Sequence, residues 1–337
     1  MIRIAHIIAV GDSSEVPGAR RVAIQCAQEL RLSENATGRA ALIATELATN
    51  LVKHGGGGSI LAGSNELQDR SLILLSIDKG KGIANVNSAL SDGFSTAGTQ
   101  GTGLGAVQRA SASFDLYTLR DHGTVVASTI EEDAPRAVSM EAPPRISVAG
   151  ISIPKPKEDH NGDSWAAMPG RDVYTIGVAD GLGHGPMAET ASAAAVRMFA
   201  ARASQSLEQM MEETHGELRP TRGAAAALAR IHASLNRVDF LGVGNIAGTI
   251  ASDDSLRKTV SLPGIVGHEM RKLQTFSYPW SASSVLILHS DGLGTSWNPS
   301  TYPGLLQHDA AVIAAVLYRD YGRGNDDATV VVAKATR

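Results

Sequence analysis

The chain has 337 residues, of which 43% are hydrophobic and 19% charged; at roughly 150 residues per domain this predicts two folded domains and excludes a disordered or fibrous chain. The net charge of -4 is small, and neither half has the basic character of a protein that binds nucleic acid or a membrane. Its one cysteine, Cys26, excludes internal disulfides and thiolate metal sites, and without a long apolar run or a signal-peptide pattern we expect a cytoplasmic protein.

Residues 1–133 predict an α+β sandwich in which helices cover one face of a mixed sheet. The apolar runs indicate strands at residues 2–10, 59–62, 71–78, 114–119 and 124–130. The helical patterns lie at residues 16–30 and 34–54 and from residue 104 onward. A glycine-rich loop precedes the third helix and indicates a phosphate site, because free backbone N–H groups at the start of a helix favour anions.

Polar residues of this half lie on one helix face and at the end of a strand, which is the arrangement that a nucleotide site requires. Glu46 and Asn50 are four apart on the second helix and leave it on the same face, although such a pair is often only a solvated surface. Asp78 ends an apolar strand, where its carboxylate can accept a hydrogen bond from an exocyclic amine. The glycines that follow at two-residue steps let a ring approach the backbone. A lone glycine loop also makes ordinary turns, so the order of these elements carries the prediction.

The motifs ELATN, DKGKG, GTGLGA and a closing GT, in that order, resemble those of the Bergerat-fold (GHKL) ATPases. DGFSTAG followed by GLGAVQR is especially similar to the small serine kinases of bacterial partner switching, above all the stressosome switch kinase, and less so to the anti-sigma-factor kinases. The resemblance implies that Glu46 acts as the base or orienting group for the attacking serine, that Asn50 holds Mg²⁺ beside ATP, and that Asp78 binds the adenine amine. The residues implied to shape the ATP pocket are Gly80, Gly82, Gly101, Gly103, Gly105 and Thr124.

Residues 134–145 carry three prolines and no periodicity, which predicts a linker. The remainder, residues 146–337, predicts sheets covered by helices. Strands are expected at residues 146–153, 173–179, 243–251, 259–262, 285–289 and 329–333. Helices are expected at residues 187–204, 223–236 and 309–321.

Aspartates end several of these apolar strands: Asp163, Asp180, Asp291, and Asp326 beside Asp327. Any one of them could be an ordinary turn residue. Taken together, oxygen ligands without cysteine or clustered histidine select a hard cation, Mg²⁺ or Mn²⁺, and several carboxylates can hold two ions. Two such ions activate a water and stabilise the leaving oxygen in a phosphoryl transfer.

The motifs ADGLGHG, SDGL and DDAT resemble those of the PP2C-type serine/threonine phosphatases of the SpoIIE subfamily. The resemblance implies a β-sandwich flanked by helices and two Mn²⁺ or Mg²⁺ ions, with Asp180 as the bridging ligand. The implied metal ligands are Asp163, Asp180, the carbonyl of Gly181, Asp291 and Asp326.

The second half departs from that subfamily at two points. Gly162 stands where larger members have a second acidic residue, and no arginine near the start of the domain matches their phosphate-binding one. His184 either lines the site or stabilises the turn that holds it. Metal coordination is therefore expected to be completed by water.

Together the halves predict a bifunctional regulator that phosphorylates, and also dephosphorylates, a serine or threonine of a small antagonist, expected to be a STAS-domain protein. One alternative makes the first half only a nucleotide-sensing or partner-binding module beside a phosphatase. Another is a pure nucleotide hydrolase. The small residues of the alanine-rich helices expected at residues 191–195 and 224–227 would permit the close contact of a homodimer.

Overall fold

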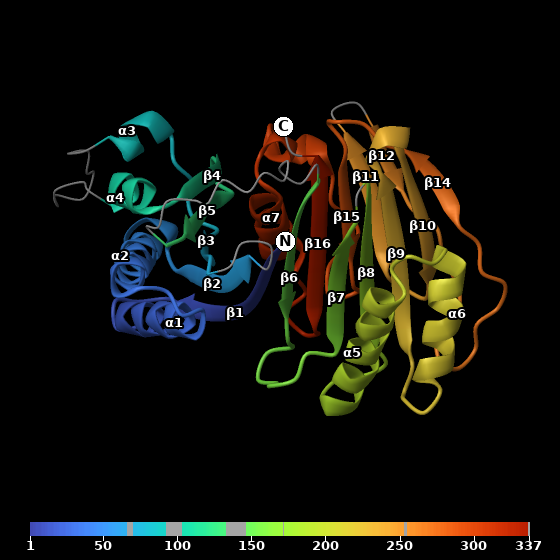
Figure 1. Ribbon diagram of the computed structural model, residues 1–337. Coiled ribbons are helices and arrows are strands. Elements are labelled where there is room, and N and C mark those ends of the chain that lie inside the picture. The colour runs from blue at the N-terminus through green and yellow to red at the C-terminus, as the bar shows by residue number, and fades with distance from the viewer. Residues whose placement is uncertain (66–69, 92–102, 133–145, 171, 253–254, 336–337) are drawn as a thin grey trace. The chain divides into compact units, whose positions relative to one another are not determined.

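The computed structural model describes residues 1–65, 70–91, 103–132, 146–170, 172–252 and 255–335 (Figure 1). The chain forms two compact units, the first made of Met1–Ala142 and Tyr302–Arg319, the second of Pro143–Thr301 and Asp320–Arg337. Residues 302–319 therefore group with the first unit, whereas the sequence assigned them to the second half. The predicted linker lies outside the described residues. Each unit combines sheet and helices, which confirms the predicted α+β class.

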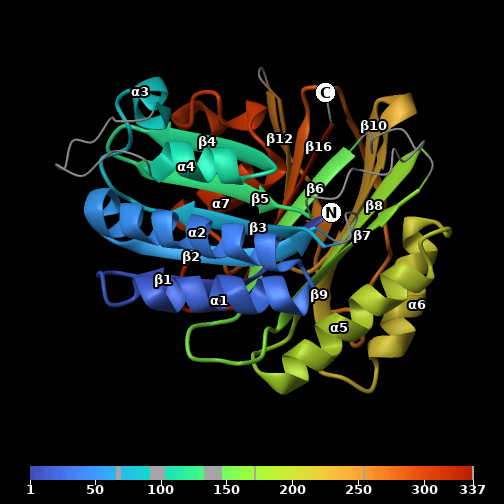
Figure 2. The same ribbon diagram turned by 60° about the vertical axis from the view of Figure 1, so that its left-hand side comes forward.

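The first unit is built on an antiparallel sheet with the strand order β1-β2-β3-β5-β4. Its strands are β1 (Ile2–Val10), β2 (Gly58–Asn65), β3 (Leu72–Ile77), β4 (Ser113–Leu119) and β5 (Gly123–Ile130). Its helices are α1 (Val16–Glu29), α2 (Glu34–Asn50), α3 (Val86–Leu90), α4 (Gly103–Ala110) and most of α7 (Ala310–Tyr321). Helices α1, α2 and α4 cover one face of the sheet, and α7 lies on the opposite face (Figures 1 and 2).

Helix α2 has a defined beginning and end. The hydroxyl of Ser33 accepts a hydrogen bond from the Ala36 N–H and caps the first turn. Its buried face is mostly alanine, which lets α1 pack closely against it. The helix ends at Asn50 and not at residue 54, because the chain continues through a π-helical turn, Leu51–Gly55, that is closed by Gly56 at φ 68°.

The second unit is a sandwich of two sheets, in which Gly150 of one lies against the ring of Trp165 of the other. Their strand orders are β12-β11-β15-β16-β6 and β13-β10-β9-β8-β7, and β14 also pairs with β10. The strands are β6 (Ile146–Ile153), β7 (Asp163–Pro169), β8 (Val173–Gly181), β9 (Ala224–His232), β10 (Arg237–Val243), β11 (Ala247–Ser252), β12 (Ser255–Lys258), β13 (Ser261–Leu262), β14 (Phe276–Pro279), β15 (Val285–His289) and β16 (Ala328–Ala335). Helices α5 (Pro186–Ala201) and α6 (Leu207–Leu218) cover the β7–β10 sheet (Figure 1).

One helix prediction for this unit is wrong, and another helix was not predicted at all. The alanine run predicted as a helix over residues 223–236 is strand β9, buried between β8 and β10, where tertiary packing overrides the helical propensity of alanine. Helix α6 was missed, although Ser206 and Gln209 form the capping box that announces it.

The alanines on which the homodimer prediction rests pack against other parts of the same chain. Those of α5 are buried against the sheet of their own unit apart from the half-buried Ala193, and those of β9 lie inside it. Among the described residues, no helix combines the length and the apolar character needed to cross a membrane.

Candidate active sites

The structure brings Glu46, Asn50 and the start of α4 together. A Cβ added at Gly103 would lie 3.3 Å from Asn50 Oδ1 and 3.4 Å from Glu46 Oε2, so any side chain at this position would press on both groups. The side-chain nitrogen of Asn50 is buried and has no hydrogen-bond partner among the described residues. An orphaned buried amide beside a carboxylate and a helix start is an arrangement that a bound polar group would complete.

Asp78 follows β3 and is held in place by the neighbouring backbone. Its Oδ1 accepts hydrogen bonds from the N–H groups of Gly80 (2.8 Å) and Thr124 (3.1 Å), while its own N–H donates to the Thr124 carbonyl. No hydrogen bond to Oδ2 occurs among the described residues, so this oxygen can accept a further hydrogen bond. Burial raises the pKa of Asp78, and the two backbone hydrogen bonds and the charge of Arg319 oppose that rise.

Glycine is required where the chain passes closest to Asp78. A Cβ at Gly123, which has φ 90°, would lie 2.0 Å from the Asp78 carbonyl oxygen. A Cβ at Gly80 would lie 2.9 Å from the backbone of Gly55, and Gly82 has φ 70°. Of the predicted pocket residues, Gly80 and Thr124 lie beside Asp78 and bind it through their N–H groups, whereas a Cβ at Gly82 would meet the backbone of Leu119.

The other two glycines predicted for this site, Gly105 and Gly101, have different outcomes. Gly105 is buried on α4 two residues beyond Gly103. Gly101 lies outside the described residues, as does the DGFSTAG segment.

In the second unit, Asp163 and Asp180 lie directly opposite each other on the antiparallel strands β7 and β8. Side chains opposite each other in such a ladder share one face, and like charges there repel. Asp163 is 3% exposed. Its Oδ2 accepts a 2.6 Å hydrogen bond from the Ser290 hydroxyl, whereas its Oδ1 is buried with no partner among the described residues. Two carboxyl groups in this arrangement disfavour the state in which both are ionised.

The remaining predicted ligands have distinct surroundings. Asp291 Oδ2 accepts a 2.8 Å hydrogen bond from the Asn245 amide. Asp327 is buried, and its two oxygens accept hydrogen bonds from the N–H groups of Lys155 and Gly162. Asp326 is exposed, and among the described residues the N–H of Asp327 is the one donor to its side chain. Of the adjacent pair, both carboxylate oxygens of Asp327 thus bind the backbone, whereas Asp326 can accept further hydrogen bonds or bind a cation.

The charges of these aspartates interact. Burial first, and then the neighbouring carboxylates, raise the pKa of Asp180 well above its ordinary value. Burial also raises the pKa of Asp163, although the Ser290 and Thr329 hydroxyls oppose it, and the Asp327 and Asp291 charges add to the rise. Among the described residues, no three acidic, histidine or cysteine side chains already converge as a finished metal cage. Even so, the orphaned oxygen of Asp163 and the crowded carboxylates fit a hard cation.

Gly181 is the last residue of β8, and its N–H donates to the Gly162 carbonyl. A Cβ at Gly181 would lie 2.1 Å from the Ala188 carbonyl, so the start of α5 is packed directly on this loop. His184 lies 3.2 Å from Glu158, in an ion pair when the ring is protonated. Burial raises the pKa of Asp327, and the hydrogen bonds from Lys155 and Gly162 and the charge of His184 oppose that rise.

Sequence reasoning missed three residues that the structure brings to these sites. Ser290 and Asn245 hold two of the aspartates predicted as metal ligands, and the serine adjacent to Asp291 in SDGL was a visible signal. Arg222 is exposed, and its Nη1 lies 3.0 Å from where a Cβ of Gly183 would be. Among the described residues it makes no hydrogen bond or ion pair, so a guanidinium stands free beside the loop that follows Asp180.

Two families match the chain, one in each half. Residues 11–130 match the Histidine kinase-like ATPase domain family, HATPase_c_2. Residues 170–336 match the Stage II sporulation protein E family, SpoIIE. This confirms both resemblances that the sequence motifs indicated.

Individual proteins resemble one half or the other. The chain is 31% identical over 115 residues to the Serine/threonine-protein kinase RsbT of Bacillus subtilis, a match that covers 33% of this chain and 85% of RsbT. It is 28% identical over 134 residues to the Phosphoserine phosphatase RsbX of the same organism, covering 39% of this chain and 67% of RsbX. It is also similar to a solved chain described with the bacterial stressosome, with a TM-score of 0.53 and 28% identity over 56% of this chain and 99% of that one.

Proposed function

Because the chain belongs to the partner-switching regulators, with a histidine kinase-like ATPase domain followed by a SpoIIE domain, we propose that it both phosphorylates and dephosphorylates a serine or threonine of an antagonist protein. The observation that carries the proposal is that one chain holds two separate polar sites, each with an orphaned buried atom: Asn50 Nδ2 in the first and Asp163 Oδ1 in the second. The antagonist is a STAS-domain protein in this proposal.

In the kinase reaction, Glu46 accepts the proton of the attacking hydroxyl or orients it, and Asn50 turns its side-chain oxygen to the Mg²⁺ of Mg-ATP. The Mg²⁺ ion neutralises phosphate charge. Asp78 Oδ2 accepts a hydrogen bond from the adenine amine while its Oδ1 stays bound to the backbone. The backbone at Gly103 lets the phosphates approach the start of α4.

In the phosphatase reaction, Asp180 would be the central ligand for divalent ions, Mn²⁺ or Mg²⁺, and water would supply the ligands that the protein does not. A pair of such ions supplies an activated water and offsets the charge that develops on the leaving oxygen. Ser290 and Asn245 orient Asp163 and Asp291 from behind through their hydrogen bonds. The other proposed ligands are Asp163, the carbonyl of Gly181, Asp291 and Asp326.

The experiment that tests both activities follows γ-labelled ATP with Mg²⁺ and Mn²⁺ into a STAS-domain acceptor. We expect label on the acceptor with the wild type, no label with Glu46→Gln, and label that accumulates with Asp180→Asn. If no acceptor is labelled while release of phosphate from phosphoserine still depends on Asp180, the first domain is a nucleotide-sensing or partner-binding module. Label released to water without any acceptor would instead identify a nucleotide hydrolase.

We further propose that Arg222 binds the phosphate of the phosphoprotein, because its guanidinium is exposed beside the loop that follows Asp180. Arginine pairs with phosphate through two parallel hydrogen bonds. Arg222→Ala is expected to raise KM for the phosphoprotein about 10-fold or more, with partial rescue by Arg222→Lys. Steady-state kinetics measure this, and Arg219→Ala, an exposed arginine of the same turn, is the matched control. Equal KM values for Arg222→Ala and the control would contradict the assignment.

A further inference from the structure

Helix α7 belongs to the nucleotide-binding unit although its sequence lies inside the SpoIIE match. Every residue from Ala310 to Leu317 is buried. An apolar helix of this kind packs against an apolar surface and does not face water. Within the first unit, α7 lies on the sheet face opposite α1 and α2, where β3 and β5 are also buried (Figure 2). The ATP-binding unit is thus completed by a helix from the other half of the sequence.

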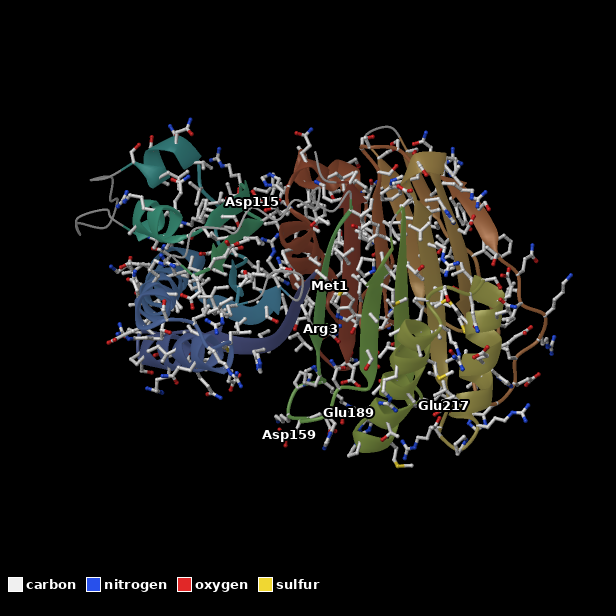
Figure 3. The ribbon with its side chains drawn as sticks, in the orientation of Figure 1. Met1, Arg3, Asp115, Asp159, Glu189 and Glu217 are labelled. Atoms are coloured by element: carbon white, nitrogen blue, oxygen red, sulfur yellow. The ribbon has the colours of Figure 1, made fainter. Side chains whose placement is uncertain are left out.

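The start of α7 is anchored by one carboxylate of β4, Asp115, which Figure 3 labels. Asp115 Oδ1 lies 2.8 Å from His308 Nδ1, and Asp115 Oδ2 accepts a 2.8 Å hydrogen bond from the Asp309 N–H. The His308 ring also stacks edge-on against Tyr117, with centroids 5.3 Å apart. Burial would raise the pKa of Asp115, but these hydrogen bonds and the His308 charge outweigh it and lower the pKa. An ionised carboxylate at the start of a helix also interacts favourably with the helix dipole and stabilises the helix.

Near its other end, α7 reaches the proposed adenine site. Arg319 is 7% exposed, and its Nη1 donates a 3.1 Å hydrogen bond to the Asp78 carbonyl. Asp78 is therefore held on every polar backbone atom: its N–H by Thr124, its carbonyl by Arg319. The charge of Arg319 also favours the ionised form of the Asp78 carboxyl. A shift of α7 along its axis would move the residue that binds adenine.

Directly after Arg319, the chain contacts the loop that carries Asp291. The Tyr321 carbonyl accepts from the Gly294 N–H, and the Arg323 N–H donates to the Gly292 carbonyl, each at 2.9 Å. Asp326 follows three residues later. The end of α7 thus leads by covalent and hydrogen bonds into two proposed ligands of the phosphatase metals.

We propose that Arg319 is a positioning residue for Asp78 and that α7 couples the two active sites, so that nucleotide binding changes the metal affinity of the phosphatase site. This inference rests on the proposed function of both sites. Coupling of this kind is reciprocal: the factor by which ADP changes Mn²⁺ affinity equals the factor by which Mn²⁺ at that site changes ADP affinity. The chain would then report its nucleotide state as phosphatase activity without any added partner.

The test measures Mn²⁺ activation of p-nitrophenyl phosphate hydrolysis by the full chain, at buffered free Mn²⁺, with and without saturating ADP. For the wild type we expect the half-activating Mn²⁺ concentration to change at least about 5-fold with ADP. For Arg319→Gln we expect ADP to leave the half-activating Mn²⁺ concentration unchanged. We also expect ADP affinity, measured by calorimetry, to weaken about tenfold. Arg319→Lys keeps the charge and is expected to restore part of both effects. Arg219→Gln, the same change at an exposed arginine, is expected to behave as the wild type.

The outcomes separate the coupling from the proposed function. If the wild type binds ADP and is activated by Mn²⁺ but its half-activating Mn²⁺ concentration does not change with ADP, the coupling is wrong. The proposals for the two separate sites are then unaffected. If Arg319→Gln lowers only the melting temperature and keeps the wild-type factor, Arg319 is structural and the proposal is overturned. If the wild type binds no ADP, the nucleotide site and the coupling fall together.

Discussion

Replacing Asp180 by asparagine is expected to abolish the phosphatase activity and, without metal, to raise the melting temperature. Asparagine keeps the shape of the side chain but removes one of two charges that face each other across β7 and β8. The metal-free fold is then relieved of a repulsion of up to about 1 kcal/mol, equivalent to about 2–4 °C for a folded unit of roughly 150–250 residues such as this one. Loss of the central metal ligand is expected to lower activity at least about 100-fold.

The pH dependence of this stabilisation has a definite sign. The pKa values of Asp163 and Asp180 are raised in the folded chain, so the native state keeps protons that the unfolded chain releases near pH 4. The stability that these groups contribute is complete below about pH 4 and is lost as the pH rises through their folded pKa values. The difference in melting temperature between Asp180→Asn and the metal-free wild type is therefore expected to widen from about pH 5.5 to about pH 8.5.

Thermal melts in a chelator, repeated with Mn²⁺, measure this directly. Glu217→Gln, the same chemical change at an exposed position of α6 that Figure 3 labels, is the matched control. It is expected to leave the activity and the pH dependence unchanged. A metal-free Asp180→Asn protein that melts below the wild type at pH 8.5 would show that the two carboxylates do not repel, and the metal site as proposed would be wrong.

Replacing Glu46 by glutamine is expected to remove the kinase activity and leave nucleotide binding nearly intact. Glutamine has the size of glutamate and fits against Gly103, but it cannot accept the proton of the attacking hydroxyl. Loss of a general base typically costs about 10²- to 10⁴-fold in rate. Asp78 and Asn50, which hold adenine and Mg²⁺ in this proposal, are untouched, so ADP affinity is expected to change less than about twofold.

Initial rates of acceptor labelling and ADP calorimetry on the same preparation separate the two effects. Glu34→Gln lies at the exposed start of the same helix and serves as the control, with kinase rates expected to equal those of the wild type. Labelling by Glu46→Gln at the wild-type rate would exclude Glu46 as the base. A parallel loss of ADP affinity would show instead that Glu46 shapes the binding site.

Local patterns predicted much of the fold because short apolar runs between turn residues indicate strands and periodic apolar residues indicate helices. The predicted bounds of β1, residues 2–10, and β15, residues 285–289, agree with the structure. The same logic failed at β9, where a run of alanines is buried on both faces and carries no strand signal. It also failed for α6, whose start was marked only by Ser206 and Gln209.

The site residues divide in a similar way. Glu46 and Asn50 could be paired from helical spacing alone, and the structure places them together against Gly103. The pairing of Asp163 with Asp180 depends on the register of two strands, which no local pattern encodes. Ser290 reaches Asp163 across 127 residues of sequence, so its part in the site became visible only in the folded chain.

The sequence by itself determined the two families, the order of their motifs and the residue types of both sites, because these depend on short segments whose chemistry is local. Only the tertiary structure decided which unit owns α7 and that Arg319 reaches the Asp78 carbonyl, 241 residues away in the sequence. An apolar helix can cover any apolar face of suitable shape, so its sequence does not say which sheet it will bury. That choice depends on packing and on the anchoring of its two ends, by Asp115 at the start and Asp78 near the finish.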